Sequence, residues 1–155
     1  MAYQKLQPLA ALNVIPDDNI IIPLPNQVAT GATNGSGSLK LIDSSAKFLT
    51  TASVGDVIYS GTGTVRDAIT TVTAVDTNIQ LSVSTAVAVT KNYNIYSSDL
   101  NEGAVLYVGT QGNVVVETAA GNEVTFTGIT AGTFMPIQIL KVKTATTASN
   151  IIAMW

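Results

Sequence analysis

Residues 69–83 read Ile-Thr-Thr-Val-Thr-Ala-Val-Asp-Thr-Asn-Ile-Gln-Leu-Ser-Val, and this stretch decides the fold class. Its two halves, 69–75 and 79–83, are rich in β-branched residues and alternate with the period of two that is typical of strands. Between them, residues 76–78 form the turn sequence Asp-Thr-Asn. The stretch therefore predicts two antiparallel strands joined as a β-hairpin.

Similar short apolar runs lie on both sides of this hairpin. A second hairpin is predicted between residues 104–108 and 113–117, through the Gly-Thr-Gln-Gly sequence at 109–112. Residues 43–48 are the one plausible helical turn, with Asp43 or Ser44 as its cap. The other expected strands are at 57–59, 93–96, 123–127, 137–143 and 151–155. We predict an all-β fold of short antiparallel strands in two small sandwich- or barrel-like units, with an extended N-terminal arm.

The distribution of proline and glycine suggests where the parts of the chain begin and end. Residues 1–30 contain four of the five prolines and are predicted to be an extended arm, since proline disfavours helix. An N-terminal strand folded back onto its own domain is the equally weighted alternative. Residues 31–38 read as a Gly/Ser linker. The first β unit is then expected at 39–98 and the second at 99–155.

Composition excludes several classes of function. Of the 155 residues, 46% are hydrophobic and only 11% are charged, with a formal net charge of −3. Nucleic-acid binding needs clustered Lys and Arg, and the chain has no basic stripe. No apolar run approaches the length of a membrane span, and we expect neither a membrane segment nor a secretion signal.

The residues needed for most enzyme chemistry are missing. Cysteine and histidine are both absent, which excludes thiol catalysis, Cys/His zinc sites and Ser-His-Asp hydrolysis. Asp43, Asp56, Asp67 and Glu117 are candidate glycosidase carboxylates, but such sites need an aromatic-lined cleft, and aromatic residues make up only 6% of the chain. We assign these carboxylates to turns or the surface. We predict a non-enzymatic protein with no catalytic residue, no metal site and no cofactor.

Two apolar segments need burial somewhere. Ile20, Ile21, Ile22 and Leu24 lie in the predicted arm, where an exposed apolar patch would be unusual for a soluble monomer. Trp155 ends the chain after an apolar run, and chain ends fray unless they are pinned. It is expected to pack into its own core, which we favour, or into a neighbouring subunit. These five residues are the predicted interface set.

Two groups of motifs in the sequence resemble modules of phage structural proteins. The first group resembles a β module repeated in fibre, tail and other virion proteins of phages. Its motifs are Leu41-Ile-Asp-Ser-Ser-Ala-Lys-Phe48, Val54-Gly-Asp-Val-Ile-Tyr59, Thr71-Val-Thr-Ala-Val75, Ile79-Gln-Leu-Ser82 and Tyr93-Asn-Ile-Tyr96. The second group is similar to a small C-terminal module of structural proteins in marine and cyanobacterial tailed phages. Its motifs are Gly112-Asn-Val, Gly121-Asn-Glu-Val-Thr-Phe126, Gly132-Thr-Phe-Met-Pro136, Thr144-Ala-Thr-Thr-Ala-Ser149 and Ile152-Ala-Met-Trp155.

The resemblance implies a location in the virion, assembled in the cytoplasm of the host bacterium, and no catalytic residues. We expect a capsid decoration or cement protein that acts through self-assembly and arm exchange. Its partners would be further copies of itself, as a trimer or ring, and the major capsid protein or other virion proteins. A neck, tail, baseplate or fibre protein is the alternative. A carbohydrate- or receptor-binding module is disfavoured, because its candidate stacking residues, Tyr59, Tyr93, Tyr96 and Tyr107, fall at strand positions.

Overall fold

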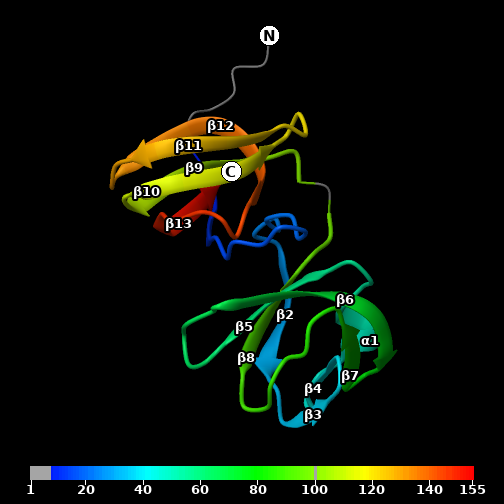
Figure 1. Cartoon of the computed structure of the whole chain (residues 1–155). Coiled ribbons are helices and arrows are strands. Elements are labelled where there is room, and N and C mark those ends of the chain that lie inside the picture. The colour runs from blue at the N-terminus through cyan, green and yellow to red at the C-terminus, as the bar shows by residue number, and fades with distance from the viewer. Residues whose placement is uncertain (1–7, 100) are drawn as a thin grey trace. The chain divides into compact units, whose positions relative to one another are not determined.

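The structure, a computed structural model, describes residues 8–99 and 101–155 and confirms the all-β prediction (Figure 1). Within this range the chain forms thirteen strands and one four-residue helix, α1 (Phe48–Thr51). Two compact units are present. Unit 1 combines residues 8–25 with 101–155, and unit 2 consists of 26–99.

Unit 2 is a curled antiparallel sheet with the strand order β2-β8-β5-β6-β7-β4-β3. The long strand β6 pairs with β5 through its first half and with β7 through its second half, so it serves two parts of the sheet. The edge strands β2 and β3 are separated by only two residues of chain, which brings the sheet's two ends together. The strands are β2 (Gln27–Ala32), β3 (Gly35–Gly37), β4 (Lys40–Ile42), β5 (Val57–Gly61), β6 (Ala68–Thr77), β7 (Gln80–Val83) and β8 (Asn92–Tyr96).

The predicted hairpin at 69–83 is present as β6 and β7, with Val75 opposite Leu81. Its inward side chains join a core that includes Phe48 and Tyr93, whose rings lie 6.0 Å apart. The predicted helical turn at 43–48 is wrong in position. Asp43 is buried, and its Oδ1 accepts a hydrogen bond from Ser45 N at 2.8 Å, which closes a side-chain turn before α1 begins at Phe48.

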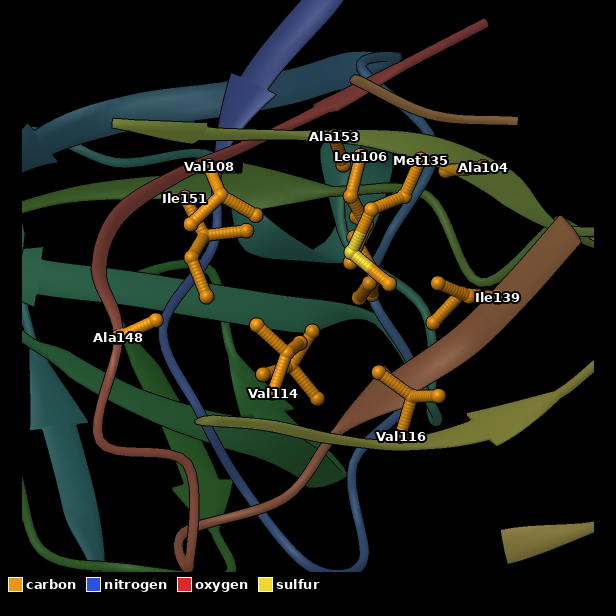
Figure 2. Packing of buried hydrophobic residues seen from close by; sticks show 12 residues of the cluster. Ala104, Leu106, Val108, Val114, Val116, Met135, Ile139, Ala148, Ile151 and Ala153 are labelled. Atoms are coloured by element: carbon orange, nitrogen blue, oxygen red, sulfur yellow. The ribbon is translucent and has the colours of Figure 1, made fainter. Parts of the chain in front are cut away.

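Unit 1 is a six-stranded antiparallel sheet with the order β1-β13-β9-β12-β10-β11. Its core lies between the inward side chains of these strands; Figure 2 shows Leu106, Val108, Met135 and Ile151 converging there with Val114. The strands are β1 (Ala11–Asn13), β9 (Ala104–Thr110), β10 (Gly112–Thr118), β11 (Glu123–Ile129), β12 (Thr133–Val142) and β13 (Ser149–Met154).

The predicted hairpin between 104–108 and 113–117 is wrong. Both segments are strands, β9 and β10, but β12 lies between them and pairs with each. The two strands do not pair with each other because β12 occupies the position between them. Gly112 lies close to a further segment of unit 1, where an added Cβ would lie 2.4 Å from Ala148 N. Asn113 O accepts hydrogen bonds from the same segment, at 2.9 Å from Thr147 N. The strand that β10 does form a hairpin with is the next one, β11, through the turn that contains Gly121 and Asn122.

The first 30 residues divide between the two units. Ala11 lies opposite Met154 in the β1–β13 pair, and Ile22 N donates to Leu140 O at 2.8 Å. Residues 8–25 therefore follow the alternative in which the N-terminal segment folds back onto its own domain; residues 1–7 of the predicted arm lie outside the described residues. Residues 26–30 belong to unit 2, so its boundary differs from the predicted start at 39.

The predicted linker at 31–38 also belongs to the sheet of unit 2. Thr33 is 2% exposed, and its hydroxyl donates to Ala88 O at 2.8 Å and accepts from Lys91 N at 3.0 Å. Gly31 has a packing reason to be glycine, since a Cβ would lie 2.3 Å from Asp43 Oδ2. Glycine at this position lets β2 lie close to the buried pair of Asp43 and Tyr93. It therefore serves close packing and does not indicate a flexible segment.

Candidate interaction surface

Three of the four candidate carboxylates, those of Asp43, Asp56 and Glu117, are engaged in hydrogen bonds or ion pairs within the fold. Asp43 Oδ2 accepts from the Tyr93 hydroxyl at 2.7 Å. Asp56 is 3% exposed and accepts from Ser53 N and Ser98 N, each at 2.8 Å. Asp67 is exposed, and Glu117 pairs with lysines. Among the described residues no group of three or more acidic side chains is placed to hold a metal ion. The one helix in this part of the chain has four residues, far fewer than a membrane-spanning helix needs.

Three of the four tyrosines considered for sugar stacking are buried. Tyr59, Tyr93 and Tyr96 are 2%, 1% and 8% exposed. Tyr59 and Tyr96 pack edge to face, with ring centroids 5.3 Å apart. Only Tyr107 of the four is substantially exposed, at 37%, and it lies in unit 1. The tyrosines of unit 2 are therefore core residues.

The predicted interface residues separate into three environments. Ile22 is 3% exposed and belongs to the core of unit 1. Ile20 is partly buried, whereas Ile21 is 42% exposed. Leu24 and Trp155 line one groove of about 430 Å³. The structure thus brings two of the five together at an accessible position.

The groove arises from an irregularity in β12. Met135 lies opposite Leu106 and Ile139 lies opposite Ala104, so β12 has two more residues than β9 across this interval. Pro136 lies within this bulge, where a residue without an N–H group is tolerated. The bulge lets Pro136 line the groove beside Phe134.

Asn101 fixes the position of Trp155 at the edge of the groove. Its Oδ1 accepts from Trp155 Nε1 at 3.1 Å and from Gly103 N at 2.9 Å, while its Nδ2 donates to Ile22 O at 2.6 Å. Gly103 has a φ of 118°, and a Cβ there would lie 2.7 Å from the Cβ of Gln138. Trp155 N also donates to Ala10 O at 3.1 Å. The aromatic end of the chain is thus pinned in its own unit.

The groove adjoins an apolar area on the outer face of the same sheet, opposite the core. Tyr107 lies opposite Phe134 on one side and Ile152 on the other, so the three form a row across β12, β9 and β13. Val105 lies opposite Met154 in the next row. These residues alternate with the buried ones in Figure 2, and Phe134 is 42% exposed. The five residues of the two rows are called the outer patch below.

A charge-paired area occupies the other part of this outer face. Glu117 Oε2 lies 3.1 Å from Lys141 Nζ and 3.3 Å from Lys143 Nζ, and Lys143 also lies 3.7 Å from Glu123. The hydrogen bonds from Lys141 and Lys143 lower the pKa of Glu117. Two lysines and two glutamates give this area no net formal charge. The outer face therefore has an uncharged apolar part and a neutralised ionic part.

We expect Glu117→Gln to make unit 1 less stable at neutral pH and less sensitive to acid. The pKa of the Glu117 carboxyl is lower in the folded state than in the unfolded state. Its contribution to the free energy of unfolding is therefore fully present above the ordinary Glu pKa of about 4.3, and it is lost as the pH falls through the pKa of the folded state. Denaturant unfolding from pH 7 to pH 2, followed by fluorescence of Trp155, the only tryptophan and a unit 1 residue, measures this. Asp67→Asn, in unit 2, is the control; the same acid sensitivity in both variants would contradict the assignment.

The sequence interpretation missed the outer patch. The signal available was the run Ala-Val-Leu-Tyr-Val at 104–108, which is apolar at successive positions rather than alternate ones. A strand with this pattern has two apolar faces, and a second face needs its own cover. Phe134 begins a similar apolar run, Phe-Met-Pro-Ile at 134–137, but its place beside Tyr107 follows only from the pairing of β12 with β9.

No known protein family, curated protein or solved structure matches this chain.

Proposed function

We propose that the chain is a non-enzymatic structural component of a phage virion, and specifically a capsid decoration or cement protein that acts through self-assembly. The observation that carries this proposal is the outer patch: an uncharged, partly exposed set of side chains in register over three strands. Exposed apolar areas of this kind mark interaction sites. The virion location rests on the resemblance of the sequence motifs to modules of phage structural proteins.

The geometry of β1 is compatible with arm exchange. β1 is an edge strand of three residues that pairs with β13 of its own chain, from Ala11 opposite Met154 to Asn13 opposite Ile152. In an assembly, the same backbone hydrogen bonds can be made with β13 of a neighbouring copy, which is the principle of domain swapping. The proposed partners are further copies of the chain, in a trimer or ring, together with the major capsid protein or other virion proteins.

Position in the particle is tested by copy number. Quantitative mass spectrometry of purified phage particles, with the major capsid protein as internal reference, gives the number of chains per particle. A decoration protein is expected at a simple ratio to the major capsid protein, because each copy occupies a repeated lattice position. A much smaller number would favour the alternative of a neck, tail, baseplate or fibre protein. Absence from purified particles would contradict the virion proposal.

A further inference from the structure

We propose that two copies of this chain pair through β11, the strand at one end of the unit 1 sheet, so that the two sheets continue into one another across a two-fold axis. The two strands run antiparallel, with Thr125 of one copy opposite Thr125 of the other. The inference deepens the proposed function, on which it rests for the need to self-assemble, and it adds the surface, the partner and the register. It requires no contribution from unit 2.

The free edge of β11 has unpaired backbone groups. Thr118 N donates to Asn122 O at 2.9 Å, directly before β11 begins. Hydrogen-bonded and non-hydrogen-bonded pairs alternate in an antiparallel ladder, so every second residue of β11 directs its backbone N–H and C=O away from β10. These residues are Glu123, Thr125 and Thr127. Among the described residues none forms a hydrogen bond with their backbone groups, which are therefore available to another strand.

β11 lacks the features that usually prevent a sheet edge from pairing with another chain. Such edges are short, carry lysine or proline, or are covered. β1 and β3 have three residues each, and β2 lies along a groove whose other wall includes residues 45–48. β11 has seven residues, of which five are exposed and none is lysine or proline; its one charged residue, Glu123, is the first. An added Cβ at Gly128 would meet nothing within 4 Å, so the space at the other end is open.

The side chains on the inner face of β11 favour a second copy as the partner. Val124 and Phe126 lie opposite the buried Val116 and Val114 of β10, so they face the core of unit 1. Val124 is nevertheless 37% exposed and Phe126 is only partly buried, because the sheet ends beside them. In the proposed register the valine of each copy lies opposite the phenylalanine of the other. Pairs of an aromatic and a β-branched residue stabilise antiparallel strands, and here they continue the core of each copy.

Hydrogen bonding and charge select this register. With Thr125 at the axis, two hydrogen bonds are exchanged in each of three residue pairs: Thr125 with its own mate, and Glu123 with Thr127 in both directions. A shift of the axis by one residue leaves only two such pairs. Like charges directly opposite each other destabilise a strand pair, whereas this register places each glutamate opposite a threonine. Gly128, with a φ of 67°, lies at a bulge that ends the regular stretch.

The test uses single-cysteine variants, because the chain has no cysteine of its own. Thr125→Cys should form a disulfide-linked dimer under mild oxidation by glutathione, since hydrogen-bonded partners have Cα atoms about 5.5 Å apart, a distance that a disulfide can bridge. Val65→Cys, at a position in unit 2 that is 60% exposed, measures cross-linking by random collision. Thr125→Cys should cross-link at least about tenfold faster, because pairing raises the effective concentration of the thiols. Equal rates would overturn the proposed pairing.

A mixture of two further variants tests the register. Glu123→Cys and Thr127→Cys should cross-link with each other when mixed. Each alone should react no faster than Val65→Cys, because positions four residues apart along a strand are separated by about 13 Å. A mixture that reacts no faster than its separate components would overturn the two-fold register.

Thr125→Pro tests the backbone contact without a cysteine. Proline is tolerated where the N–H points out of a sheet edge, and circular dichroism checks the fold. The substitution removes two hydrogen bonds from the contact, so it should weaken association at least about tenfold, whereas Thr125→Val keeps the N–H. Analytical ultracentrifugation at concentrations up to about 1 mM measures this.

A wild type that stays monomeric at every concentration, or a Thr125→Pro variant that is folded and associates like the wild type, would overturn the inference. If Thr125→Pro does not fold, the cysteine variants decide alone. Detection of the chain in purified particles does not depend on β11, so the virion proposal can stand when this inference fails.

Discussion

Ile22→Ala is expected to destabilise unit 1 by about 2–5 kcal/mol, the usual cost of truncating a fully buried aliphatic side chain. Ile22 is 3% exposed and packs in the core of unit 1, although it lies in a segment that the sequence predicted as an arm. Its backbone N–H also donates a hydrogen bond to Leu140 O at 2.8 Å. Both the backbone and the side chain of Ile22 therefore attach residues 8–25 to unit 1. Denaturant unfolding followed by Trp155 fluorescence reports on unit 1.

Ile21→Ala is the matched control for this experiment. Ile21 is the preceding residue, has the same side chain and is 42% exposed, so its truncation is expected to change stability by no more than about 0.5 kcal/mol. Equal effects of the two substitutions, or no effect of either, would contradict the placement of residues 8–25 in unit 1.

The second large effect is expected at alkaline pH in unit 2. Burial raises the pKa of Tyr93, and its hydrogen bond to Asp43 raises it further; burial also raises the pKa of Tyr96. In the unfolded chain both tyrosines lose their protons near the ordinary value of about 10. Above that pH the unfolded state binds fewer protons than the folded state, so the stability that is fully present below pH 10 falls as pH rises toward the folded pKa values. For Tyr93, whose pKa is raised far above 10, this loss approaches about 1.4 kcal/mol per pH unit, and Tyr96 adds to it in the same direction.

Tyr93→Phe should remove the Tyr93 part of this alkaline loss. At neutral pH the same substitution is expected to cost about 1–3 kcal/mol, because Asp43 Oδ2 loses the donor that lies 2.7 Å away. Urea unfolding monitored by far-ultraviolet circular dichroism from pH 7 to pH 12 measures both effects. Tyr107→Phe, in unit 1, should leave the alkaline behaviour of unit 2 unchanged. An alkaline profile of Tyr93→Phe that matches the wild type would show that Tyr93 does not carry the effect.

Local sequence signals predicted the elements that are formed by local contacts. The β6–β7 hairpin was predicted correctly because its turn residues lie directly between two strands that pair with each other. The strand expected at 123–127 is present within β11, which pairs with β10, the strand before it in the chain. The strand segments around 93–96 and 104–108 were also located, since β-branched and aromatic runs fit a pleated sheet wherever it forms.

Long-range pairing explains what the sequence did not predict. The β9–β10 hairpin failed because β12, which comes later in the chain, lies between its two strands. β1 pairs with β13, a strand at the other end of the sequence, and no local signal shows such a partner. The linker prediction at 31–38 failed because glycine composition indicates flexibility and close packing alike, and only the approach of Gly31 to Asp43 distinguishes them.

The candidate site also combines residues that local sequence indicates with residues that only long-range strand pairing brings together. Trp155 and Leu24 were identified from their apolar character alone, and the structure places both at the groove. The row of Tyr107, Phe134 and Ile152 needed the register of three strands, which is set by the whole sheet. Sequence patterns therefore indicated that apolar residues needed cover, whereas the fold showed which of them share a surface.

The most direct test of the central claim, that this chain is a self-assembling structural part of a virion, is a cryo-electron microscopy reconstruction of purified phage particles. The account predicts density for both β units in copies arranged around a rotation axis. In that density Phe134 and Tyr107 of the outer patch should contact a neighbouring chain of the particle. Particles without density for the chain, or with single copies whose outer patch faces solvent, would contradict it.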